Sequence, residues 1–128
     1  MELKIGQKGR AETRVIPQNT AKAIASGTLE VFSTPSMIAL MEQAAVNALA
    51  LLPGQSTVGV SLDVRHIAAT PLNVQVTANA ELVEIDRKRL VFVVEAYDEA
   101  GKIGEGRHER FIIDVESFLA KAQTRKER

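Results

Sequence analysis

The sequence contains no cysteine and no tryptophan, and aromatic residues make up only 4% of its 128 residues. The absence of cysteine excludes disulfide bonds, thiolate metal sites and a cysteine nucleophile. Only two histidines are present, without the paired spacing of a metal-binding motif, so we predict no metal site. One tyrosine and four phenylalanines provide few rings for stacking on nucleobases.

The chain also lacks an excess of charge of either sign, because sixteen Lys and Arg balance sixteen Asp and Glu. We therefore expect neither a nucleic acid nor a membrane as partner. No apolar run approaches the ~20 residues that cross a bilayer, and the first residues do not resemble a signal peptide, so we predict a cytoplasmic protein. A length of 128 residues with 45% apolar and 25% charged residues predicts one globular domain, residues 1–128.

One segment has strong helical character. Residues 35–52 consist mainly of helix formers, begin with a proline suited to a first turn, and are followed by Pro53 and Gly54. Thr34 precedes this segment and is predicted to be its N-cap. The N–H groups at this helix end could also stabilise an oxyanion, and the sequence leaves both interpretations of Thr34 open.

After Gly54 the spacing of apolar residues changes to every second residue, which is typical of half-buried strands. One long helix followed by a meander of four antiparallel strands predicts an α+β domain whose curved sheet wraps the helix. The predicted strands cover residues 58–65, 73–85, 90–97 and 103–114, with a further edge strand at 12–16 and a short C-terminal helix at 116–123.

Glu42 is the only charged residue of the predicted helix, and its neighbours one turn away are apolar. A carboxylate buried there requires a cation or several donors to offset its lost hydration. Counting by twos from Val58 places His66 on the strand face that should meet the helix. We predict that Glu42 and His66 converge on one interface, either as a core pair or as a site. The low net stability of buried pairs favours a site.

The order and spacing of these residues resemble the hot-dog-fold acyl-CoA thioesterases of the fluoroacetyl-CoA thioesterase type. The similarity extends from about Phe32 to Ile113. The segments that carry it are Val31-Phe32-Ser33-Thr34, Leu40-Met41-Glu42, Val58-Gly59, His66-Ile67-Ala68-Ala69-Thr70-Pro71 and Gly104-Glu105-Gly106-Arg107-His108-Glu109-Arg110.

This resemblance implies a hot-dog fold, in which one long central helix is wrapped by a curved antiparallel sheet of about five strands. It implies catalytic roles for Thr34, Glu42 and His66, with Gly59 and Arg110 near the substrate. It also implies a homodimer whose sheets join edge to edge, with the thioester channel at the subunit interface. No cofactor is expected, since coenzyme A arrives as part of the substrate.

The expected activity is hydrolysis of an acyl-CoA thioester, in which Glu42 and His66 act as a coupled pair that supplies the base and orients the nucleophile, and Thr34 is the nucleophile or a hydroxyl that polarises the substrate. Fluoroacetyl-specific relatives carry a longer, aromatic-rich lid, whereas residues 21–28 contain no aromatic residue, which favours a general short or medium acyl group. The alternative is a non-catalytic module that binds acyl-CoA or an acyl carrier. A hot-dog hydratase is disfavoured because no Asn-Pro dipeptide precedes a histidine.

Overall fold

A computed structural model describes residues 2–126 of the chain. Its central helix, α1 (Thr34–Asn47), begins one residue earlier and ends five residues earlier than the sequence predicts. The prediction that Thr34 is the N-cap is wrong: Ser33 caps the helix, and its side chain accepts a hydrogen bond from the Ser36 N–H. At the other end the Ala48 carbonyl accepts from the distant Gln7 side chain. The local sequence does not reveal that tertiary contact.

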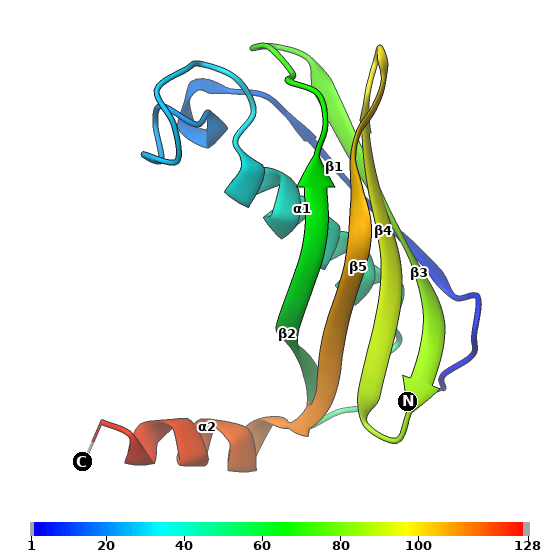
Figure 1. Ribbon diagram of the computed structural model, residues 1–128. Coiled ribbons are helices and arrows are strands. Elements are labelled where there is room, and N and C mark those ends of the chain that lie inside the picture. The colour runs from blue at the N-terminus through cyan, green and yellow to red at the C-terminus, as the bar shows by residue number, and fades with distance from the viewer. Residues whose placement is uncertain (1, 127–128) are drawn as a thin grey trace.

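Five antiparallel strands form one sheet that curls around α1 (Figure 1). The predicted four-strand meander is wrong in one respect. The third, fourth and fifth strands are consecutive neighbours, but the second crosses to the far edge and pairs with the fifth. The strands are β1 (Lys8–Arg14), β2 (Gln55–His66), β3 (Gln75–Asp86), β4 (Arg89–Asp98) and β5 (Gly101–Asp114), in the spatial order β1-β3-β4-β5-β2.

The core lies between α1 and the inner face of the sheet. Small residues on the strands, such as Ala11, Ala78 and Ala80, are buried there and let the helix approach closely. At Gly9 a Cβ atom would overlap the backbone of Ala44 in α1. The residues that α1 buries are Met37, Leu40, Met41, Ala44 and Ala45.

A β-bulge in β2 changes which residues of that strand face the helix. Gly59 pairs with Arg110 and Ser61 pairs with Glu109, so Val60 is unpaired and 52% exposed. Counting by twos from Val58 predicts that Val60 faces the core, and that prediction is therefore wrong. Beyond the bulge the alternation resumes in a new phase, and His66 lies on the inner side as predicted.

The predicted C-terminal helix is confirmed as α2 (Val115–Thr124), which the Asp114 side chain caps through the Ser117 N–H. It extends away from the sheet (Figure 1). A 3-10 turn, η1 (Pro17–Asn19), leads into the loop that precedes α1. Among the residues described, no helix has the length and apolar character needed to cross a membrane.

Replacing Gly9 by alanine is expected to lower the free energy of unfolding by about 1–3 kcal/mol, because the added methyl group must push α1 away from β1. Urea denaturation measures this change. The matched control is Lys8→Ala, at the adjacent exposed position of the same strand, which should leave stability nearly unchanged. Equal stability of the two variants would contradict this account of helix packing.

Candidate functional site

Thr34 and His66 meet where the first residue of α1 lies beside the last residue of β2. The Thr34 Oγ1 atom is 2.8 Å from His66 Nδ1. Burial lowers the pKa of His66, with the Ala68 backbone opposing that shift, so the imidazole is neutral at neutral pH. A neutral ring with its proton on Nε2 accepts the hydroxyl hydrogen at Nδ1. This arrangement can draw a proton from Thr34.

The other ring nitrogen of His66, Nε2, is buried and has no hydrogen-bond partner in the described part of the chain. A cavity of about 280 Å³ lies beside the pair. Its lining residues are Ala21, Ser26, Val31, Phe32, Thr34, His66, Ile67, Ala68 and Ala69.

Glu42 forms a second cluster further along α1. Its Oε2 atom accepts a hydrogen bond from Arg110 Nη1 at 3.2 Å and lies 4.0 Å from His108 Nε2. Gly59 leaves room for this carboxylate, since a Cβ atom there would be 2.6 Å from Oε2. The side chain of Glu42 is 37% exposed, so it faces both the protein and solvent. The cation that its apolar helix position requires is Arg110.

Arg110 is buried and held from two sides by Thr57. Its Nε donates to Thr57 Oγ1 at 2.9 Å, and its Nη2 donates to the Thr57 carbonyl at 3.0 Å. Burial lowers the pKa of Arg110 and the Glu42 carboxylate opposes that shift, and a guanidinium stays charged at neutral pH. Sequence reasoning missed Thr57 and His108. The i, i+2 spacing of His108 and Arg110 on one strand face could have revealed His108.

Within one chain the structure does not bring Glu42 and His66 together, so the prediction that they converge on one interface between helix and strand is wrong, while their coupling in catalysis stays a prediction. His66 contacts Thr34, and the imidazole near Glu42 is that of His108. Glu42 lies about 12 Å further along the helix axis than Thr34, and each residue meets a different part of β2. Phase on a strand determines which face a residue occupies, but not its position along the helix.

The first turn of α1 offers few free donors for an oxyanion, so that interpretation of Thr34 is not supported. Pro35 has no N–H, and the Ser36 N–H donates to the Ser33 side chain. The Met37 N–H donates to the Ser33 carbonyl. The side-chain contact at this helix end is the one between the Thr34 hydroxyl and His66 Nδ1, which makes that hydroxyl a candidate reactive group.

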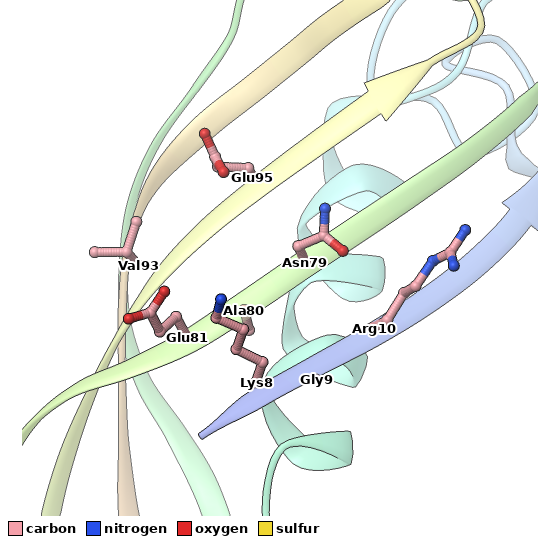
Figure 2. A pocket seen from close by; sticks show the side chains of 8 residues that line it. All are labelled: Lys8, Gly9, Arg10, Asn79, Ala80, Glu81, Val93 and Glu95. Atoms are coloured by element: carbon pink, nitrogen blue, oxygen red, sulfur yellow. The ribbon is translucent and has the colours of Figure 1, made fainter. Parts of the chain in front are cut away.

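A larger groove of about 390 Å³ lies on the face of the sheet opposite α1 (Figure 2). Its charged side chains point away from the helix. The groove is lined by none of the residues of the Thr34–His66 and Glu42–Arg110 clusters. It contains no nucleophile paired with a base, and we assign it no chemistry. The residues shown in Figure 2 are Lys8, Gly9, Arg10, Asn79, Ala80, Glu81, Val93 and Glu95.

Comparisons of the sequence with a family model and with a known protein both identify fluoroacetyl-CoA thioesterases as similar. Residues 15–116 match the family FlK, described as fluoroacetyl-CoA-specific thioesterase. A fluoroacetyl-CoA thioesterase from Streptantibioticus cattleyicolor is 45% identical over 96 residues, which cover 73% of this chain and 69% of that protein.

Solved structures agree with these sequence matches. A threonine-to-serine mutant of the FlK thioesterase in complex with acetyl-CoA has a TM-score of 0.89 at 35% identity, covering 96% of this chain and 98% of that one. A hot-dog-like protein from Thermanaerovibrio acidaminovorans has a TM-score of 0.85 at 27% identity, covering 94% and 91%. The predicted hot-dog fold of the α+β class, with one long helix and five strands, is confirmed.

The two imidazoles predict how stability depends on pH. Burial lowers the pKa of both His66 and His108, so the unfolded chain takes up protons near pH 6.5 that the folded chain does not. The free energy of unfolding should therefore fall as the pH is lowered from about 7.5 to 5.5. Urea denaturation across this range measures the slope, which should be smaller in His66→Gln. A slope of zero or of opposite sign would contradict these assignments.

Proposed function

Because the chain belongs to the fluoroacetyl-CoA-specific thioesterase family, we propose that it hydrolyses acyl-CoA thioesters with short or medium acyl groups. The observation that carries this proposal is the 2.8 Å contact between the Thr34 hydroxyl and the half-buried His66 imidazole beside a cavity. Coenzyme A enters as part of the substrate and leaves as product, so the reaction requires no separate cofactor. A cytoplasmic location stays a prediction.

In the proposed reaction, Thr34 and His66 carry out the first half. His66 Nδ1 accepts the hydroxyl proton while Thr34 Oγ1 forms a bond to the thioester carbonyl carbon. The carbon–sulfur bond then breaks, and the thiolate of coenzyme A leaves with little acid assistance because a thiol pKa is only about 8.5. The acyl group remains as an ester on Thr34. Water completes hydrolysis and releases the carboxylic acid.

Glu42 is suited to activate that water. Arg110 holds one of its oxygens, Oε2, while the partly exposed carboxylate can accept a proton through the other oxygen. Gly59 contributes by leaving space next to the carboxylate. We assign Arg110 to holding Glu42, since its three nitrogen atoms are already bonded to protein groups.

A homodimer would bring together the two halves of the proposed site, which are Thr34 with His66 and Glu42 with Arg110. Strand β2 is a twelve-residue edge with an open side, whereas the other edge, β1, has seven residues and exposes charged side chains that discourage pairing. On strand β2, Gly59 is adjacent to the Glu42 carboxylate, and His66 contacts Thr34. If two copies of β2 pair antiparallel about a two-fold axis near Leu62 and Asp63, His66 of one protomer lies beside Gly59 of the other.

The loop that borders the cavity supports a broad acyl preference. Residues 21–28 contribute only Ala21 and Ser26 to the lining, and both side chains are small. The mouth also has exposed Ile67, which offers apolar contact to a longer chain. We therefore assign short and medium acyl groups, with no special preference for fluoroacetyl.

Substitutions in both halves test the proposed activity. Glu42→Gln, His66→Ala and Thr34→Val should each lower kcat by about 100-fold or more, because each removes a proton-transfer or attacking group. Thr34→Ser keeps a hydroxyl and should retain most of the rate. Thiol release from acyl-CoAs of graded length, from acetyl to octanoyl, measures these effects.

Glu95→Gln, on the groove of Figure 2, is the matched control and should behave as wild type. Wild-type rates in folded Glu42→Gln and His66→Ala variants would remove the mechanism. Saturable binding of acyl-CoA by the wild type without any turnover would instead support the non-catalytic binding module.

Mixing inactive variants tests the shared site. A purified heterodimer of Thr34→Val and Glu42→Gln protomers should regain about half of the wild-type rate, because one of its two sites receives both intact halves. A heterodimer of Thr34→Val and His66→Ala should stay inactive, since these residues belong to the same half. A monomeric wild-type chain, or an inactive first heterodimer, would refute assembly across the interface.

A further inference from the structure

His108 is the most completely enclosed titratable side chain near the site, and the reaction described above does not use it. Its exposed fraction is 0%. It lies on β5 opposite Leu62 of β2 and Phe92 of β4, and the centre of its ring is 6.2 Å from that of Phe92. Neighbouring strands therefore hold the imidazole plane in place. A histidine buried this way needs partners for both ring nitrogens.

Hydrogen bonding determines which ring nitrogen carries the proton. His108 Nδ1 is 2.8 Å from the Ser61 carbonyl oxygen, which can only accept, so Nδ1 must donate. His108 Nε2 is 3.1 Å from Arg110 Nη1, and a guanidinium can only donate, so Nε2 must accept. The ring is therefore neutral, with its proton on Nδ1. The Ser61 carbonyl follows the bulge in β2, which ties the tautomer to that irregularity.

The same Arg110 Nη1 atom also donates to Glu42 Oε2 at 3.2 Å. A guanidinium Nη carries two hydrogens, so His108 receives one and Glu42 receives the other. The two bonds to Thr57 hold the rest of the guanidinium plane. Rotation of the guanidinium would break its bonds to Thr57, His108 and Glu42. A chain of hydrogen bonds thus runs from the Ser61 carbonyl through His108 and Arg110 to Glu42.

We propose that His108 is a positioning residue: its neutral imidazole accepts from Arg110 and so aims the second Nη1 hydrogen at the Glu42 carboxylate. This inference rests on the proposed function, in which Glu42 activates water. With the acceptor removed, Arg110 keeps its charge but loses one of the contacts that direct it. Glu42 is then less well placed, so turnover falls while binding of the substrate is preserved.

The charges around His108 agree with a neutral ring. Burial is the largest cause that lowers its pKa, and the Arg110 charge on the same strand lowers it further. The Ser61 hydrogen bond, Glu42 on α1 and Glu109 on β5 oppose this shift. From β4 the ring meets the uncharged Phe92. A protonated imidazole would place a donor against the Nη1 donor of Arg110, which would break the chain of hydrogen bonds.

Two substitutions separate positioning from packing. His108→Phe fills the space but removes the acceptor, and we expect kcat to fall at least about tenfold while KM for acyl-CoA changes less than about twofold. His108→Gln supplies a side-chain oxygen at a similar reach and should recover most of kcat. The matched control is Glu109→Gln, the adjacent outward-facing residue, which should retain wild-type kinetics. Thermal denaturation confirms that each variant is folded.

Wild-type kcat in folded His108→Phe would overturn the proposal, and so would equal losses in the Phe and Gln variants, since packing alone would then explain them. If His108→Phe does not fold, Thr57→Val provides the second test. It removes the Nε acceptor of Arg110 and should also lower kcat with little change in KM, and an unchanged kcat would count against positioning.

Nitrogen NMR of the wild-type imidazoles tests the network without substrate. We expect His108 to be the Nδ1–H tautomer at pH 7, with Nε2 as a hydrogen-bond acceptor. The Nε2–H tautomer or an imidazolium at pH 7 would refute the network directly. A wild-type chain that hydrolyses no acyl-CoA would refute the hydrolase assignment and with it any catalytic consequence of His108, even if the NMR showed the predicted tautomer.

Discussion

The close contact between α1 and the curled sheet is the constraint on which the rest of the structure depends. Glycines on the inner face make this contact possible. At Gly9 a side chain would meet the helix backbone, and at Gly59 it would meet the Glu42 carboxylate. Because the helix crosses the sheet at this short distance, Thr34 reaches the end of β2 and Glu42 reaches the middle of the same strand. The site is a consequence of that crossing.

The buried charges illustrate why this cluster is better explained by function than by stability. Removing the Arg110 guanidinium from water is costly, and a pair of which one partner is buried and the other half-buried contributes little net stability. The protein offsets that cost by satisfying the guanidinium with Thr57, His108 and the carboxylate together. An arrangement that only stabilised the fold could use apolar side chains of similar volume. Orienting a partly exposed carboxylate requires polar partners such as Arg110, whereas filling the same space does not.

The separation of the two clusters also explains how the proposed dimer and the proposed chemistry depend on one another. Thr34 with His66, and Glu42 with Arg110, are each well ordered by contacts within one chain. Within one chain Glu42, the base that we assign to water, belongs to a different cluster from the Thr34 hydroxyl. The open edge of β2 passes both clusters, so the proposed pairing of two copies along that edge would provide a complete site.

Much of the fold and part of the site could be predicted from the sequence. Residue types and their periodicity are local properties, so they indicate the long helix, the strands and the apolar surroundings of Glu42. The family resemblance supplied Thr34, Gly59 and Arg110, and the structure places each of them next to another predicted site residue.

Tertiary structure decided the rest, for physical reasons that no local pattern contains. The bulge at Val60 changes the inward phase of β2, and pairing with β5 rather than β3 sends that strand to the sheet edge. Those two features determine that His66 meets Thr34, and that Arg110 and His108 lie near Glu42 instead. By itself the sequence determined which residues are polar within an apolar setting. The pairing of those residues depends on distances along the helix and across strands, which are set only when the sheet closes around α1.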